Sequence, residues 1–102
     1  MDKARILIVD DETINLKLLE EMLANREYSL SFAKNGKKAL EVVSAARPDL
    51  ILLDIMMPKM NGYEVCTKVR ERYNLFELPV LMLTAKNQPA DVSAGLEAGA
   101  ND

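Results

Sequence analysis

The part of the sequence that most constrains the fold is the stretch 48–62, which reads PDLILLDIMMPKMNG. Its residues 50–53 form an unbroken apolar run, which is typical of a strand buried on both faces of a parallel sheet. The run ends at Asp54, and Pro58 and Gly62 then mark a loop before the next helical pattern. Open α/β sheets bind their ligands at the carboxyl ends of their strands, so Asp54 is a candidate site residue.

Two other apolar runs share this design. Residues 5–9 precede Asp10 and Asp11, and residues 79–83 precede Thr84, whereas a mixed run that contains Phe32 predicts a weaker strand at 29–33. Between the runs, apolar residues recur at helical spacing, which predicts helices over about 13–26, 37–47, 62–73 and 91–98. This alternation predicts a βαβαβαβα chain with a parallel sheet covered by helices on both faces. We expect the three most apolar strands in the centre of the sheet and the Phe32 strand at an edge.

Composition limits the kinds of site and partner that this chain can have. The sequence of 102 residues is the length of a single domain, and it contains no histidine, which excludes histidine metal ligands and histidine general bases. The net charge of -3 argues against nucleic acid as a direct partner. The sequence has a single cysteine, Cys66, which rules out an internal disulfide and fits a reducing cytoplasm. We expect Cys66 to pack on an apolar helix face. No apolar run is long enough to span a membrane, so we expect a cytoplasmic protein.

The ends of the three apolar strands predict an acidic site. Parallel strands end at one edge of a sheet, so Asp10, Asp11, Asp54 and Thr84 should gather there. Carboxylates this close repel one another, which raises at least one pKa or requires a cation, and Mg²⁺ prefers such oxygen ligands. A single acid has a simpler explanation as a helix cap, and Asp11 or Glu12 is a candidate to cap the first helix.

These residues resemble the receiver domain of two-component response regulators. The resemblance rests on Asp10-Asp11 after the first strand, Asp54 after the third, the segment MPKMNG at 57–62 and Thr84-Ala85 after the fourth. It covers essentially the whole chain, including the segment LEAGAND at 96–102. Each motif alone is weak, but the ordered set at these spacings is specific.

The resemblance implies a flavodoxin-like α/β/α fold with strand order 2-1-3-4-5. Asp54 would be the phosphoacceptor, and Mg²⁺ would be held by Asp10, Asp11, Asp54 and the backbone carbonyl of Met56. Thr84 would contact the phosphoryl group and act in a conformational switch. The phosphoryl group would come from the phosphohistidine of a histidine kinase or histidine phosphotransfer domain, since this chain has no histidine. The domain would then be regulatory rather than an enzyme, with an output domain on the same longer chain.

The family continues beyond this point with a fifth strand, which carries an aromatic residue and a phosphate-pairing lysine, and a fifth helix. The sequence stops at Asp102, so we expect residues 1–102 to form a receiver domain that is incomplete at its carboxyl end. The fourth strand, up to Thr84, would then be an exposed apolar edge, through which the chain is expected to self-associate or exchange elements between copies.

Two alternatives remain open. One is a receiver-like interaction module that lacks phosphorylation switching. The other is a metal-dependent phosphatase of the haloacid dehalogenase type, which needs Asp-x-Asp after its first strand, and Asp10-Asp11-Glu12-Thr13 does not supply that motif.

Overall fold

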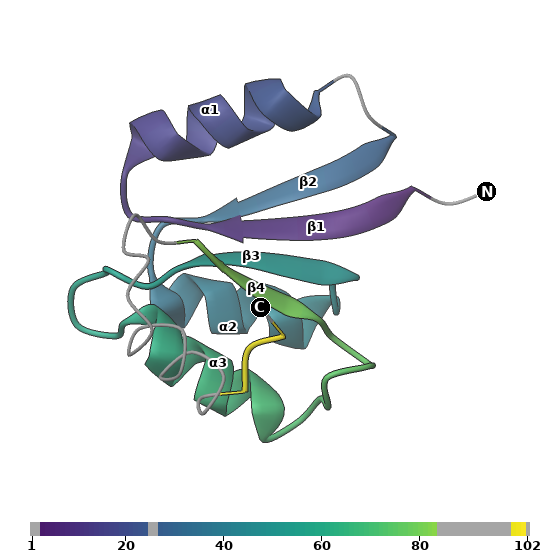
Figure 1. Ribbon diagram of the computed structural model, residues 1–102, viewed down its shortest axis with the longest axis vertical. Helices are drawn as coiled ribbons and strands as arrows, with labels where there is room; N and C mark the ends of the chain where they lie inside the picture. The colour runs from purple at the N-terminus through teal and green to yellow at the C-terminus, as the bar shows by residue number, and fades with distance from the viewer. Residues whose placement is uncertain (1–2, 25–26, 84–98, 102) are drawn as a thin grey trace.

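The fold is organised around a parallel sheet of four strands. The computed structural model describes residues 3–24, 27–83 and 99–101. The strands lie in the order β2-β1-β3-β4, and every pair is parallel (Figure 1). Their bounds are Ala4–Val9 for β1, Tyr28–Ala33 for β2, Leu50–Asp54 for β3 and Val80–Leu83 for β4. The predicted order of the first four strands and the edge position of the Phe32 strand are confirmed. β4 was also expected in the centre, but it is the outer strand of the described sheet.

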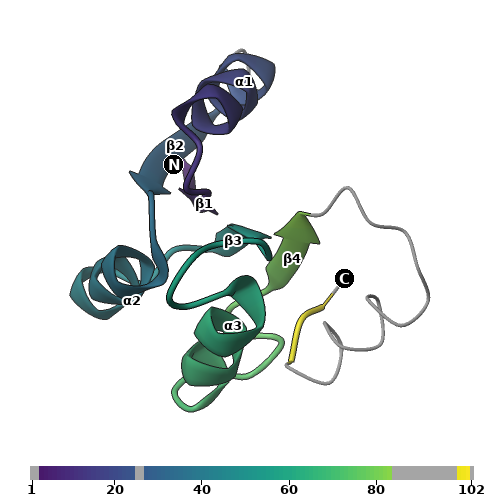
Figure 2. The same ribbon diagram turned by 90° about the vertical axis from the view of Figure 1, so that its left-hand side faces the viewer.

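Three helices complete the described layers. Helix α1 (Thr13–Leu23) lies on one face of the sheet, and α2 (Gly36–Ala45) and α3 (Gly62–Arg70) lie on the other (Figure 2). This is the α/β/α arrangement that the alternating pattern predicted, with right-handed crossovers expected for each parallel connection. The predicted helix over 91–98 falls outside the described residues.

The side chains of β1 contribute to the hydrophobic cores on both faces of the sheet. Ile6 and Ile8 pack toward α1, where Leu16 is also buried, whereas Leu7 and Val9 belong to the larger core beneath α2 and α3. Successive residues of a strand point to opposite faces, so a strand buried on both faces must be apolar at every position. This explains the unbroken runs in the sequence.

Helix α1 carries a second apolar stripe that does not face the sheet. Its buried side is made by Leu16, with Leu19 and Leu23 packed against the same cluster. On the outer side, the exposed fractions of Ile14, Leu18 and Met22 are 70%, 52% and 72%. The spacing of these residues is helical, but only the structure separates the stripe that packs on the sheet from the stripe that does not.

The helix ends follow local capping rules. Asn35 precedes α2 and accepts a hydrogen bond from the backbone N–H of Lys38 (2.7 Å), so the helix begins at Gly36, one residue before the predicted start. Asn61 and Glu64 form a reciprocal capping box at the start of α3. Helices α2 and α3 end at Ala45 and Arg70, two and about three residues earlier than the spacing suggested, because the last predicted turns unwind into the connections.

Gly62 sets how closely α3 approaches the end of β3. A Cβ at this position would lie 2.5 Å from the backbone oxygen of Asp54 and 2.8 Å from the Cα of Ile55. The backbone N–H of Gly62 donates to the Ile55 carbonyl at 3.0 Å. The loop of residues 55–61 can therefore close tightly only because residue 62 has no side chain.

We predict that Gly62→Ala lowers the free energy of unfolding by about 1–3 kcal/mol, because the added methyl group meets backbone that cannot rotate away. Urea denaturation measures the change. Gly36→Ala is the comparison variant: its Cβ would meet side-chain atoms of Met60 and Val65 at 2.8 Å rather than backbone atoms, so we expect a smaller loss. An equal loss in both variants would show that the close approach at Gly62 is unimportant.

Candidate functional site

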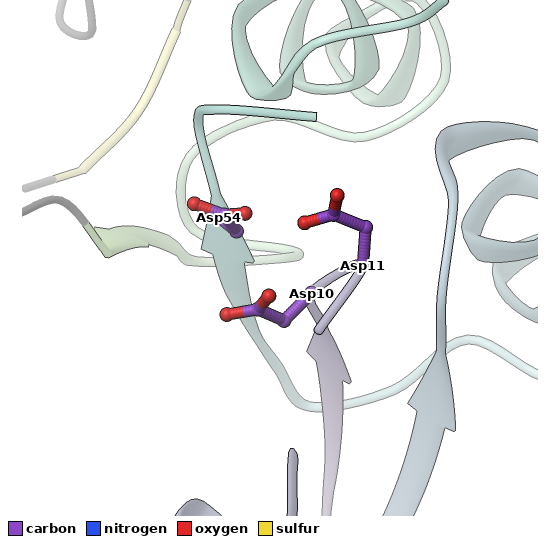
Figure 3. Close-up of side chains that lie close together, drawn as sticks. All are labelled: Asp10, Asp11 and Asp54. Atoms are coloured by element: carbon purple, nitrogen blue, oxygen red, sulfur yellow. The ribbon is translucent and has the colours of Figure 1, made fainter. Parts of the chain in front are cut away.

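The candidate site lies at the carboxyl ends of two neighbouring strands. In the register of β1 and β3, Val9 pairs with Leu53, so Asp10 and Asp54 are the next residues of adjacent strands. Figure 3 shows the side chains of Asp10, Asp11 and Asp54 converging above these strand ends. One carboxylate oxygen from each of the three residues lies within 4.8 Å of the others. The predicted gathering of the three acids is confirmed.

Asp10 is the most firmly held of the three. It is buried, with 5% of its surface exposed. Its backbone N–H donates to the Ala33 carbonyl (3.0 Å), and its two carboxylate oxygens accept from the backbone N–H of Glu12 (2.9 Å) and from Nδ2 of Asn15 (3.1 Å). These bonds offset the cost of burying a charged group and fix its orientation.

The same contacts settle how the first helix is capped. Glu12 occupies the position before α1, but its side chain makes no capping hydrogen bond. The Asp10 carboxylate instead accepts from the N–H of Glu12 and from the side chain of Asn15 in the first turn of the helix. Capping by the side chain of Glu12, one of the simpler explanations for this acidic run, is therefore not what the structure shows. Asp11 remains half-buried beside Asp54.

The carboxyl group of Asp54 has a raised pKa. Partial burial raises the pKa of its carboxyl, the backbone N–H of Met56 lowers it, and the nearby charges of Asp10 and Asp11 raise it again. The Met56 N–H donates to Oδ1 of Asp54 at 3.2 Å. The net effect is a raised pKa, which means that the site favours either a proton or a cation near Asp54.

The acids open into a groove of about 650 Å³. Apolar side chains from α1 and β4 form much of its wall, beside the polar groups of the strand ends. The lining residues are Asp10, Glu12, Asn15, Leu18, Leu19, Met22, Asp54, Met56, Met82 and Leu83. An acidic edge next to an open groove leaves room for a ligand or a partner side chain to reach Asp54.

The structure adds some residues to the predicted site and leaves others undecided. Asn15, Met82 and Leu83 line the groove, and no sequence pattern predicted them, because their position depends on how α1 and β4 lie relative to Asp54. Thr84 falls outside the described residues. The backbone N–H of Met56 contacts Asp54, whereas the metal-binding role expected for its carbonyl stays a prediction. Cys66 is fully buried, as expected for a packing residue, and burial raises the pKa of its thiol.

Comparison with known proteins identifies the class. The model of the response regulator receiver domain family matches residues 6–102. The chain therefore belongs to this family, and it is a receiver domain of the response regulators of two-component systems. Helices long and apolar enough to cross a membrane are absent from the described residues.

Individual relatives agree with this class. The chain is 44% identical over 98 residues to the alkaline phosphatase synthesis transcriptional regulatory protein PhoP of Bacillus subtilis, a match that covers 96% of the chain and 40% of the relative. It is 43% identical over 99 residues to the response regulator PleD of Caulobacter vibrioides, covering 97% of the chain and 22% of the relative. The chain thus spans less than half the length of these relatives.

Solved structures match the fold as well. The chemotaxis protein CheY4 of Vibrio cholerae has a TM-score of 0.88 at 34% identity, with 96% of this chain and 82% of that chain covered. A putative response regulator of Chloroflexus aurantiacus has a TM-score of 0.88 at 38% identity, with coverage of 98% and 82%. These similarities confirm the flavodoxin-like fold class.

The raised pKa of Asp54 predicts how the ionisation of this residue affects stability. In the folded chain Asp54 loses its proton at higher pH than in the unfolded chain, so its ionisation at neutral pH destabilises the fold. We predict that Asp54→Asn raises the melting temperature by a few degrees at pH 7 without divalent metal. The gain should vanish at a pH low enough to protonate Asp54 in both states.

Thermal unfolding followed by circular dichroism across this pH range measures the effect. Glu20→Gln is the control, because it removes one negative charge from an exposed position on α1, away from the three acids. If both variants gained the same stability at pH 7, the change would reflect net charge and not the cluster.

Proposed function

We propose that Asp54 is a phosphoacceptor and that Asp10 and Asp11, with Asp54, hold a divalent cation beside it. The observation that carries the proposal is the convergence of three carboxylates within 4.8 Å at the ends of β1 and β3. The donor set fits Mg²⁺, a hard cation that binds carboxylate and carbonyl oxygens. The Met56 carbonyl is the proposed fourth protein ligand, by resemblance to the family.

The proposed chemistry is transfer of a phosphoryl group from a phosphohistidine of a histidine kinase or histidine phosphotransfer domain. A carboxylate oxygen of Asp54 forms a bond to phosphorus, and the bond between phosphorus and the imidazole nitrogen breaks with its electron pair left on the nitrogen. A bound Mg²⁺ would supply positive charge to offset the charge on the phosphoryl oxygens. The chain's own residues position the nucleophile.

Each acid has a different part in that positioning. Asp10 is buried and fixed by Glu12 and Asn15, so it provides a rigid ligand at the base of the site. The Met56 N–H orients one carboxylate oxygen of Asp54. Thr84 follows β4 in the sequence, and we assign it contact with the phosphoryl group and a role in the switch, by resemblance to the family. The relatives are longer than this chain, which supports a separate output domain on the same polypeptide.

We predict that incubation with acetyl phosphate and Mg²⁺ adds one phosphoryl group to the chain and that Asp54→Asn abolishes this addition. In this reaction the carboxylate attacks phosphorus and acetate leaves. Intact-mass spectrometry measures the product, which should be labile to hydroxylamine because it is an acyl phosphate.

Asp49→Asn is the matched control. Asp49 precedes the opposite end of β3 and is exposed, so this variant should react like the unmodified sequence. Asp11→Asn should weaken Mg²⁺ binding about tenfold or more, since it removes a charged ligand. A label on Asp10 or Asp11 would contradict the assignment of the nucleophile, and the absence of any label would favour an interaction module without phosphorylation.

We also propose that the outer edge of β4 mediates self-association of this chain. β4 has no strand on its outer side within the described part of the chain, and Leu81, Met82 and Leu83 are only partly buried. Exposed apolar edge strands readily pair with other chains. The edge is not wholly open, however, because the backbone N–H of Asn101 donates to the Val80 carbonyl at 2.9 Å.

We predict that the sedimentation coefficient of the chain rises with concentration and that Leu81→Lys reduces the rise, because a charge on an edge strand opposes pairing. Ser29→Lys, which places the same charge on the opposite edge strand, should have little effect. A chain that sediments as a monomer at every concentration would contradict this part of the proposal.

A further inference from the structure

Arg70 holds together three segments at the end of the sheet opposite the acids. It is the last residue of α3, and its guanidinium donates from all three nitrogens. Nε donates to the Gly99 carbonyl (2.6 Å), and Nη2 donates to Oδ1 of Asn101 (2.8 Å). Nη1 contacts three carbonyls of the connection to β4, those of Tyr73 (3.3 Å), Asn74 (3.2 Å) and Leu78 (2.7 Å). No carboxylate of the described residues forms an ion pair with this guanidinium.

Asn101 is tied to the first residue of β4. Its backbone N–H donates to the Val80 carbonyl, and its Oδ1 accepts from the Val80 N–H, both at 2.9 Å. The N–H of Ile51 in β3 donates to the carbonyl of Pro79, the residue before Val80. In a parallel ladder the backbone groups of successive residues point alternately toward and away from the neighbouring strand, so those of Val80 point away from β3. Asn101 therefore occupies the outer edge of β4 where that strand begins.

The side chain of Asn101 links this contact to Arg70. Its Oδ1 accepts from both Arg70 and Val80, and its Nδ2 donates to the Leu75 carbonyl at 3.1 Å. A single amide group thus connects α3, the loop before β4 and the edge of β4. If the guanidinium were lost, Oδ1 of Asn101 would keep only the bond from the Val80 N–H and would lose one of the two donors that fix its position.

Gly99 shows that the contact with Arg70 is close. It has a φ of +101°, which L side chains rarely adopt, and a Cβ there would lie 2.5 Å from Cγ of Arg70. The chain at residue 99 is therefore laid directly against the aliphatic part of the arginine side chain. Both the backbone conformation and the missing side chain suit this approach.

We propose that the hydrogen bonds of Arg70 hold residues 99–101 on the outer edge of β4. We call the contacts among Arg70, Gly99, Asn101 and Val80 the clasp. The planar guanidinium presents N–H donors in three directions, and the two hydrogens of Nη1 are shared among three carbonyls, whereas a lysine ammonium has its three donors on one nitrogen and cannot span oxygens this far apart. When the clasp is closed, the N–H and carbonyl of Val80 are used within the chain. When it opens, both groups become free to pair with another strand.

The experiment is hydrogen exchange, resolved to single amides, on the 102-residue chain and its variants. In Arg70→Lys we expect the amides of Val80 and Asn101 to exchange about tenfold faster or more, because each is protected by the clasp. The amide of Ile8, in the middle of β1, should change by less than about twofold. Asn101→Ala should accelerate exchange at Val80 in the same way, and its exposed position makes it the milder variant if Arg70→Lys folds poorly.

Arg72→Gln is the matched control. Arg72 lies two residues further along and is exposed, and its guanidinium contacts Ser44 Oγ (3.0 Å) and the Tyr73 ring (5.7 Å to the centroid). This variant removes a positive charge from the same connection and should leave Val80 and Asn101 protected. Unchanged protection of Val80 in both Arg70→Lys and Asn101→Ala would overturn the proposal. Equal acceleration at Ile8 would also overturn it, because Arg70 would then support global stability and not a local clasp.

Discussion

The mutual repulsion of Asp10, Asp11 and Asp54 is the interaction on which the rest of the site depends. Carboxylates at this separation favour a proton or a cation between them. Partial burial is the largest cause of the raised pKa of Asp54, and the charges of Asp10 and Asp11 raise that pKa further. The fold maintains the arrangement because the residues that hold it belong to rigid elements. Asp10 and Asp54 extend two strands whose register is fixed by a buried core, so they cannot move apart without disrupting that core.

Local contacts then refine the positions of the acids. The start of α1 satisfies both oxygens of Asp10, and the tight approach of Gly62 to the backbone of Asp54 fixes the loop that carries the Met56 N–H. These contacts hold the carboxylates of the site in a preorganised arrangement.

The two ends of the sheet have opposite characters. At the carboxyl end, negative charges gather and open into a groove. At the other end, Arg70 uses its charge to satisfy backbone carbonyls, and Arg47 and Arg72 lie over the ring of Tyr73. The carboxylates that repel one another therefore lie at one end of the sheet. The hydrogen bonds that connect segments distant in the sequence lie at the other end. The described edge of β4 runs between the two ends.

The sequence by itself predicted the alternation of strands and helices, the burial of the apolar strands on both faces and the gathering of the three acids, whereas the strand order came from the resemblance to receiver domains. The first three predictions follow from apolar runs that end in Asp10, Asp11 and Asp54, because the geometry of a parallel sheet leaves little choice once the strands are known. The predicted helix starts at 13, 37 and 62 also fall within one residue of the starts of α1, α2 and α3.

Only the tertiary structure decided which groups meet across long separations in the chain. Helical spacing could not tell that Leu16 faces the sheet while Ile14, Leu18 and Met22 face outward, because α1 is apolar on two sides. Nor could it reveal that Arg70 meets residues 29 and 31 positions away, at Gly99 and Asn101. Such contacts depend on how helices and connections settle against the sheet within a few ångströms, and a one-dimensional pattern of apolar and polar residues does not encode those distances.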